Sequence, residues 1–159
     1  MINILLLGLA IVPAILADVP TGCVTLKFVN NAKHINMWDK TVLHYRKLYG
    51  GDEKEEWVIE KSGNDYKIRP RIYTEYLYAE SKTDDPGRAV KTLKEGTTDA
   101  NVWKVEQKMA LYWISNVKYQ ECLVISGSDH VVTKKMDSCG DDLWEIQPVS
   151  NCLIVGKKN

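Results

Sequence analysis

The feature that most constrains this chain is a short pattern that occurs three times. Tryptophan is followed by any residue, then isoleucine or valine, and then glutamate or glutamine, at Trp57, Trp103 and Trp144. These tryptophans lie 46 and 41 residues apart in a chain of 159 residues. Because a period of about 20 to 50 residues is typical of a repeated structural unit, we expect three similar units, each ending at its tryptophan.

The segments before each tryptophan are short and rich in β-branched and aromatic residues, and turn-forming residues separate them. This pattern predicts strands rather than long helices. The expected strands are about 22–30, 34–40, 42–48 and 55–61, then 66–73, 75–81, 88–94 and 101–107, then 110–116, 121–127, 131–136 and 142–147. The repeats would span about 22–61, 66–107 and 110–147, with a closing strand near 150–156. Three units of four short strands predict an all-β protein, a β-trefoil, in which three hairpins cap a six-stranded barrel.

The first seventeen residues contain no charged side chain, and residues 4–16 are almost wholly apolar. This run is shorter than the roughly 20 residues that span a bilayer, so residues 1–17 are interpreted as a signal peptide. Residues 18–159 would then form one secreted, extracellular domain. No later apolar run is as long as a membrane span, and we expect a monomer.

The charges of the chain are balanced, with 21 basic and 21 acidic residues. Binding to nucleic acid or to anionic membranes requires clustered cations, so neither is expected as a partner. The sequence has no nucleophile elbow, zinc-protease motif or phosphate loop. Residues 126–130 place Ser, Asp and His together, but adjacent side chains diverge along the chain, so this segment is interpreted as a polar hairpin tip. We expect no catalytic site and no cofactor.

The four cysteines in residues 18–159 are Cys23, Cys122, Cys139 and Cys152. An even number in a secreted chain favours disulfides, and no spacing typical of a zinc site is present. Three connectivities are possible. We expect Cys122–Cys139, which closes a local loop, and Cys23–Cys152, which ties together the two ends that a trefoil brings close.

In the third unit, residues 122–125 read Cys-Leu-Val-Ile, and Cys139 then precedes Asp142-Leu143-Trp144. This unit resembles the ricin-B-type (R-type) lectin repeat. The family joins two such cysteines by a disulfide and places a sugar-binding aspartate directly after its Cys-Leu pair. In this chain Val124 and Tyr78 occupy that position, and Met37 is the nearest match in the first unit. The resemblance therefore implies a lectin scaffold whose sugar-binding carboxylates are replaced.

Five residues are candidates for ligand binding, on hairpin loops such as 81–88 and 127–131 or beside them: Trp38, Tyr78, Asp84, Asp85 and Asn101. Trp38 stands next to a carboxylate, with His34 and Asn36 nearby, and an aromatic ring beside polar groups suits a sugar. A second cluster contains Tyr73, Tyr76 and Tyr78 with Arg69 and Arg71. Both clusters could equally be structural. Leu111 and Trp113 share one side of an alternating strand and are expected in the core.

The leading hypothesis is a secreted binding protein without catalytic activity that recognises glycans or glycoproteins. The alternative is a secreted trefoil that acts on a protein target, either as a protease inhibitor or as an immune-modulating ligand. Kunitz-type inhibitors and fibroblast-growth-factor-like cytokines share this architecture, and residues 82–88 offer basic side chains for an inhibitory loop. A degenerate lectin retained for protein contacts is a third possibility.

Overall fold

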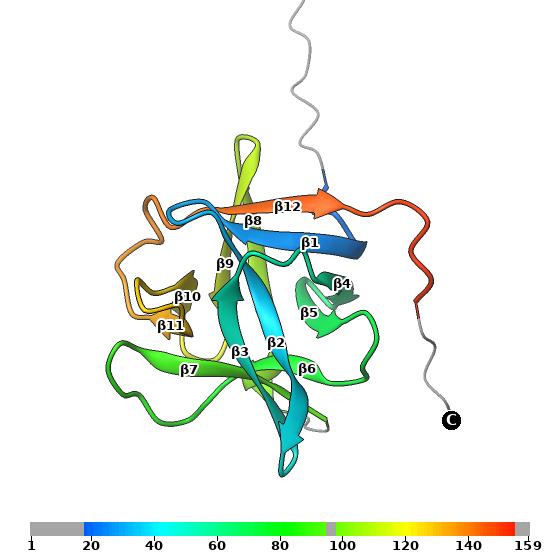
Figure 1. The fold of residues 1–159 in the computed structure, drawn as a ribbon. Helices are drawn as coiled ribbons and strands as arrows, with labels where there is room; N and C mark the ends of the chain where they lie inside the picture. The colour runs from blue at the N-terminus through cyan, green and yellow to red at the C-terminus, as the bar shows by residue number, and fades with distance from the viewer. Residues whose placement is uncertain (1–17, 95–97, 155–159) are drawn as a thin grey trace, which may run out of the picture.

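The computed structural model describes residues 18–94 and 98–154, and this part of the chain contains twelve strands and one short 3-10 turn, η1 (Asp99–Asn101) (Figure 1). The strands are β1 (Gly22–Phe28), β2 (Lys33–Val42), β3 (Tyr45–Gly51), β4 (Glu56–Ser62), β5 (Asp65–Pro70), β6 (Tyr76–Ala79), β7 (Arg88–Leu93), β8 (Trp103–Lys108), β9 (Leu111–Asn116), β10 (Glu121–Ile125), β11 (Val131–Lys134) and β12 (Trp144–Pro148). The expected signal peptide, residues 1–17, lies outside the described residues. Within the described part, no helix has the length and apolar character to cross a membrane.

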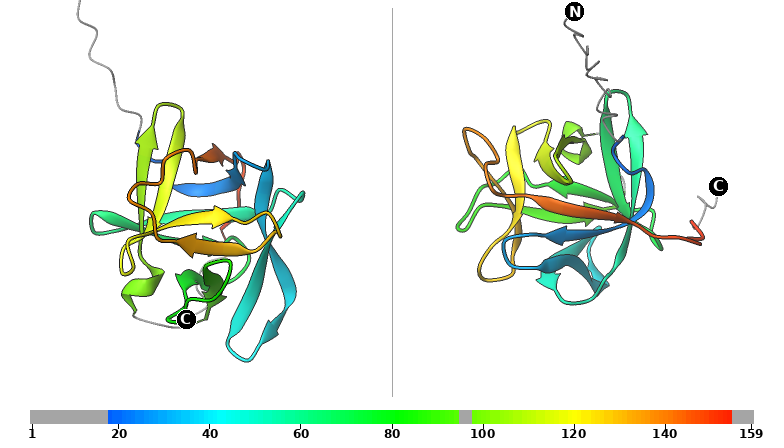
Figure 2. Two further views of the ribbon diagram at one scale, coloured as in Figure 1. Left: turned by 90° about the vertical axis from the view of Figure 1, so that its left-hand side faces the viewer. Right: turned by 90° about the horizontal axis from the view of Figure 1, so that it is seen from above.

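Six of the strands pair in a closed ring. The antiparallel pairs β1–β4, β4–β5, β5–β8, β8–β9, β9–β12 and β12–β1 return to the starting strand. The other six strands form the pairs β2–β3, β6–β7 and β10–β11, and β7 also pairs with β3 and with β11. Figure 2 shows this arrangement from two further sides. The all-β prediction is confirmed, and each of the twelve strands overlaps a predicted one.

The expected closing strand is the exception. Residues 150–154 form no strand, and residues 155 and 156 lie outside the described part of the chain. The reason is that β1 already has a neighbour on each side, with β12 on one and β4 on the other. No edge of β1 is left for another strand, so β12 itself closes the ring.

The three repeated tryptophans have the same burial and the same hydrogen-bonding pattern. Trp57, Trp103 and Trp144 are completely buried. Each donates its indole N–H to a backbone carbonyl in the first strand of its unit's hairpin pair, with distances of 3.0, 2.9 and 2.9 Å to Ile35, Leu77 and Leu123. Such a bond satisfies a polar group that would be costly to bury alone. Each tryptophan therefore links one hairpin to the ring by a hydrogen bond. The residues that accept these bonds occupy equivalent positions in the three units: Ile35, Leu77 and Leu123.

Both expected disulfides are present. Cys23 and Cys152 have Cα atoms 6.1 Å apart, and the Cα atoms of Cys122 and Cys139 are 5.6 Å apart. The first bridge is possible because the chain after β12 remains beside β1, where the N–H of Val149 donates to the carbonyl of Cys23 at 2.9 Å. Among the described residues, no group of three His, Cys, Asp or Glu side chains could hold a metal ion.

The prediction that Trp113 lies in the core is wrong. In β9 the buried side chains are Tyr112, Ile114 and Asn116, whereas Leu111 and Trp113 are partly exposed. The Trp113 indole N–H donates to the carbonyl of Gly140 at 3.0 Å on the outside of the ring. Both phases of this strand carry large apolar residues, so alternation alone could not decide which phase faces inward.

Candidate functional site

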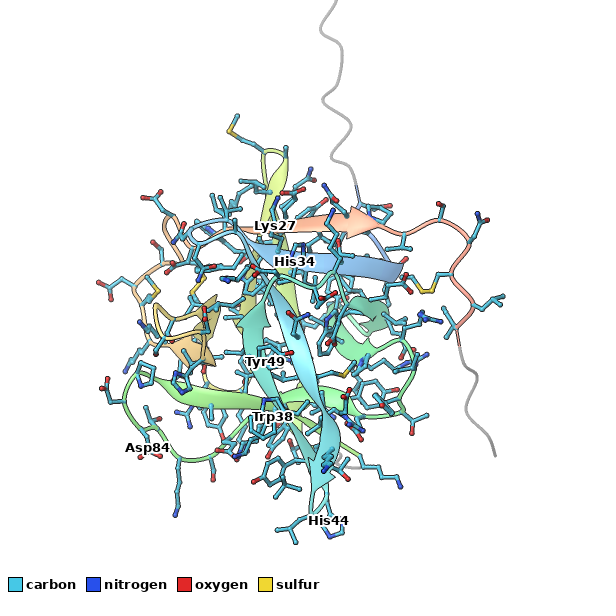
Figure 3. The ribbon with its side chains drawn as sticks, in the orientation of Figure 1. Lys27, His34, Trp38, His44, Tyr49 and Asp84 are labelled. Carbon is cyan, nitrogen blue, oxygen red and sulfur yellow. A yellow bond between two sulfur atoms is a disulfide. The ribbon has the colours of Figure 1, made fainter. Side chains whose placement is uncertain are left out.

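The longest hairpin pair, β2–β3, extends away from the ring (Figures 1 and 2). It carries two large aromatic side chains that are open to solvent: Trp38 is 50% exposed and Tyr49 is 38% exposed. Figure 3 shows both on the same hairpin, with His44 at its tip. Exposed aromatic rings near polar groups are typical of recognition sites, so the surface around Trp38 is the candidate functional site.

A break in strand pairing helps to turn Trp38 outward. The register between β2 and β3 shifts between Met37 and Thr41. The buried guanidinium of Arg46 donates to the carbonyl of Trp38 at 2.8 Å and to the carbonyl of Asp39. Arg46 is itself paired with the buried carboxylate of Glu75 at 3.3 Å. The bulge that presents Trp38 is therefore held from inside the protein.

On one side of Trp38 is a groove of about 440 Å³, here called the basic groove. The side chains that give it its chemistry are Trp38, Lys47, Tyr49, Lys91, Asp129 and His130. The Lys47 ammonium lies 5.3 Å from the centre of the Trp38 ring. β3 and the β10–β11 turn meet here through a bridge between Tyr49 and His130, and Lys91 comes from β7, so the groove lies where the three hairpins meet.

The β10–β11 turn supplies hydroxyl and imidazole groups to the basic groove. The Ser128 hydroxyl lies 2.8 Å from Nδ1 of His130, and 3.1 Å from the hydroxyl of Ser126. Among the described residues, no carboxylate hydrogen-bonds His130. The serines and the histidine of this turn thus bond to one another at a polar hairpin tip.

On the other side of Trp38 is a hollow of about 530 Å³, here called the acidic groove, which Asp39, Glu53 and Glu55 help to line. Glu55 accepts a hydrogen bond from the backbone N–H of Met37 at 3.1 Å. Burial raises the pKa of the Glu55 carboxyl above its ordinary value. Trp38 thus lines two grooves whose side chains differ in charge.

The structure distributes the other predicted site residues over separate places. Asp84 and Asp85 are exposed on the β6–β7 loop, and Figure 3 shows Asp84 well away from Trp38. Asn101 is buried, 6% exposed, in η1, so its side chain is not available to a ligand at the surface. Trp38 is the one of the five predicted residues that lines a groove of the candidate site.

Tyr78 is half-buried on β6. Burial, and then the charge of Glu80, raises the pKa of Tyr78 to about 12. The structure also corrects its equivalent in the first unit. Because Ile35 and Leu77 accept the indole hydrogen bonds, the equivalent of Tyr78 is Asn36, one residue before the expected Met37. Asn36 is fully buried and donates to the carbonyl of Glu53 at 2.8 Å.

The tyrosine and arginine cluster is occupied by contacts within the protein. Arg69 pairs with Glu60 at 2.7 Å, and the Tyr76 hydroxyl donates to the same carboxylate at 3.3 Å. The ring of Tyr73 lies 3.8 Å from the Arg46 guanidinium carbon. These side chains brace β4, β5 and the β2–β3 hairpin, which favours the structural interpretation of this cluster.

Sequence reasoning missed Lys47, Tyr49 and Arg46. Lys47 and Tyr49 alternate on the exposed face of β3, but alternation does not indicate which other unit meets that face. Arg46 looks like another surface cation in the sequence, and only its burial shows its role. The signal that was available was Trp38, an aromatic residue next to the carboxylate Asp39.

No protein-family model matches the sequence, and no curated protein matches it. Among solved structures, a salivary protein from Culex quinquefasciatus that belongs to the Cysteine and Tryptophan-Rich family is similar, with 25% identity and a TM-score of 0.75 over 84% of this chain and 97% of that one. A ricin B-like lectin from Macrolepiota procera, in complex with lactose, has 14% identity and a TM-score of 0.65, covering 82% and 99%. A proteinase inhibitor from Coprinopsis cinerea has 12% identity and a TM-score of 0.67, covering 83% and 100%. The last two likenesses concern the fold alone.

Proposed function

We propose that this protein is a secreted β-trefoil without catalytic activity that resembles the R-type lectins and binds glycans at the surface around Trp38. The closed ring of six strands with three hairpin pairs supports the trefoil assignment. The two disulfides support a secreted protein, because such bridges persist in oxidising compartments. The observation that carries the function is the half-exposed Trp38 ring above a groove with polar groups.

A glycan needs two kinds of contact, and the basic groove offers both. One face of a pyranose ring presents C–H groups, which pack on an aromatic ring such as Trp38. The hydroxyls need hydrogen-bond partners, which Ser128, Asp129 and His130 supply from the opposite hairpin. A concave site with an apolar surface and a few placed polar groups is typical of small-ligand recognition.

The site lies in a different place from that of the family it resembles. The residues at the family's sugar-binding aspartate position are Asn36, Tyr78 and Val124, and Asn36 and Val124 are buried. Glycan binding would therefore use the hairpin residue Trp38, two positions beyond Asn36. The Culex salivary protein and the lactose-bound lectin are compatible with such a role on this fold.

A glycan array with the wild-type protein and with Trp38→Ala tests the proposal. We expect Trp38→Ala to weaken binding at least about tenfold, or roughly 1.4 kcal/mol, because the stacking surface is lost. Leu43→Ala is the matched control, since Leu43 is an exposed apolar residue, 84% exposed, at the tip of the same hairpin. An array without wild-type binding, or equal binding by Trp38→Ala, would overturn the proposal.

The exposed Leu43 also favours the second candidate function, contact with a protein target. The side chain stands at the tip of the projecting β2–β3 hairpin, and single projecting loops are how inhibitors of this architecture present themselves to a protease. Inhibition of a panel of serine and cysteine proteases by wild type, and its loss in Leu43→Ala, would support this function. Inhibition unchanged in Leu43→Ala would exclude this tip as the contact.

A further inference from the structure

We infer that the glycan recognised at Trp38 carries an anionic group, a carboxylate or a sulfate, which binds at Lys47. This inference rests on the proposed function and names the class of ligand for the same site. It follows from the different charges of two grooves beside Trp38, and from the position of Lys47, which makes no ion pair among the described residues.

Two of the grooves that border Trp38 differ in the charge of their side chains. The acidic groove has three carboxylates, Asp39, Glu53 and Glu55, against one lysine, Lys40. An anion placed there would be repelled. The basic groove is lined by Lys47, by Lys91 and by a single carboxylate, Asp129, so an anionic substituent of a sugar stacked on Trp38 meets less repulsion on this side.

The lysines near the basic groove are not equally available. Lys91 is paired with Glu80 and lies 4.1 Å from the centre of the Tyr45 ring. Lys33, next to Asp129, is paired with Asp52 at 2.9 Å. Among the described residues, Lys47 takes part in no ion pair. Lys47 is therefore the cation in this groove whose charge is not balanced by a carboxylate partner.

The position of Lys47 also suits a ligand that stacks. Its ammonium lies 5.3 Å from the centre of the Trp38 ring, so a sugar held against that ring has its substituents within reach of the ammonium. A charge-assisted hydrogen bond to a carboxylate or sulfate is about twice as strong as a neutral one. The same contact discriminates between an acidic sugar and its neutral parent.

Three related probes distinguish the alternatives: lactose, 3′-sialyllactose and 3′-sulfolactose, titrated by calorimetry into the full protein at low and at high salt. We expect at least one acidic probe to bind at least about tenfold more tightly than lactose, with a preference that falls as salt increases. Lys47→Gln should remove the preference, so that the acidic probes bind no more tightly than lactose does to the same variant. Lys40→Gln is the matched control, because Lys40 is exposed on the same hairpin but lines the acidic groove, and it should keep the preference.

The outcomes separate this inference from the proposed function. Equal binding of all three probes that depends on Trp38 would overturn the inference and keep the function. A preference that Lys47→Gln leaves intact would also overturn the inference. Binding of none of the probes, together with an empty glycan array, would overturn both. Melting temperatures of the two lysine variants, both at exposed positions, check that each is folded.

Discussion

The contacts between neighbouring units differ in a way that explains where the candidate site lies. At two contacts between units, a buried arginine of one hairpin and a threonine of the next unit both donate hydrogen bonds to a glutamate of that next unit. These contacts are here called the first junction (Arg46, Glu75, Thr92) and the second junction (Arg88, Glu121, Thr133). In the third junction the strand register places Asp129 at the position of the arginine, Lys33 at that of the glutamate and Gly50 at that of the threonine. The charges there are reversed, and the threonine is replaced by glycine.

The first two junctions are here called sealed, because the arginine and the glutamate of each are buried. In the second, Arg88 pairs with Glu121 at 2.8 Å, and Thr133 donates to the same carboxylate at 2.6 Å. Burial acts to raise the pKa of Glu121, but the bonds from Arg88 and Thr133 outweigh it, so the net pKa is lowered. The ring of Tyr119 covers the guanidinium at 3.6 Å, as Tyr73 covers Arg46.

The third junction is open to solvent. Asp129 is exposed, and Lys33 turns to Asp52, whose hydrogen bond raises the pKa of the Lys33 ammonium. The contact that remains at the centre is a backbone hydrogen bond, from the N–H of Gly50 to the carbonyl of Asp129 at 2.7 Å. Asp129 and His130 line the basic groove. Two junctions with buried ion pairs thus hold the hairpins, and exposed residues at the third one line the basic groove.

The largest effect is expected when one sealed pair is broken. Arg88→Met leaves the carboxylate of Glu121 buried without its partner, and we expect a loss of about 3 to 5 kcal/mol in the free energy of unfolding. Urea denaturation measures it. The double variant Arg88→Met with Glu121→Leu should recover most of the loss, because no buried charge remains. A loss below about 1 kcal/mol in the single variant would show that this junction is not sealed.

Breaking the first junction should lower the free energy of unfolding by a similar amount and should also weaken glycan binding. Arg46→Met removes the donor to the carbonyls of Trp38 and Asp39, so the bulge that presents Trp38 loses its internal support. At a temperature where both variants are folded, we expect Arg46→Met to weaken glycan binding about tenfold and Arg88→Met to leave it unchanged. Equal binding by the two variants would show that the bulge needs no support from Arg46.

A side chain at Gly50 tests why the third junction lacks a threonine. A Cβ at this position would lie 2.4 Å from a methyl group of Ile125. We expect Gly50→Ala to cost about 1 to 3 kcal/mol in the free energy of unfolding. Gly127→Ala is the control, since its Cβ would have no neighbour within 4 Å, and it should change stability by less than about 0.5 kcal/mol. Similar values for the two variants would contradict the steric explanation.

Acid should destabilise the protein through His34, which lies on β2. Burial, and then the charges of Lys27 and Lys54, lowers the pKa of His34 below 6.5. A group whose folded pKa is lowered binds protons more readily when unfolded, so stability is full above pH 6.5 and falls as the pH drops below it, by at most about 1.4 kcal/mol per pH unit. Unfolding free energies at pH 7.5 and 5.5 measure this loss, and His34→Gln should reduce it. An unchanged loss in the variant would assign it to another group.

The smallest effect is expected at the open junction itself. Asp129→Asn keeps the backbone hydrogen bond to Gly50 and suits the positive φ of 62° at this residue. We expect a change within about 0.5 kcal/mol, in contrast to Arg88→Met. A loss comparable with that of Arg88→Met would remove the distinction between open and sealed junctions.

Much of the fold could be read from the sequence because the repeat is local. The spacing of Trp57, Trp103 and Trp144 set the number of units, and turn-forming residues marked the ends of the strands. The errors have specific causes. Trp113 was misplaced because both faces of its strand are apolar, and the residues expected to close the ring at 150–154 found β1 already paired on both sides. For the candidate site, Trp38 was among the predicted residues, but Lys47 and Tyr49 were not.

The sequence by itself therefore determined the all-β class, the three equivalent tryptophans and the two disulfides of this protein, since turn residues, repeat spacing and cysteine positions are properties of the chain order. Only the tertiary structure decided which face of β9 points inward, which arginines are buried, and that the third junction is open. These depend on register and on contacts between distant segments, such as that of Gly50 with Asp129. The difference in charge between the two grooves beside Trp38 also depends on the tertiary structure, because the basic groove is lined by residues of three hairpins.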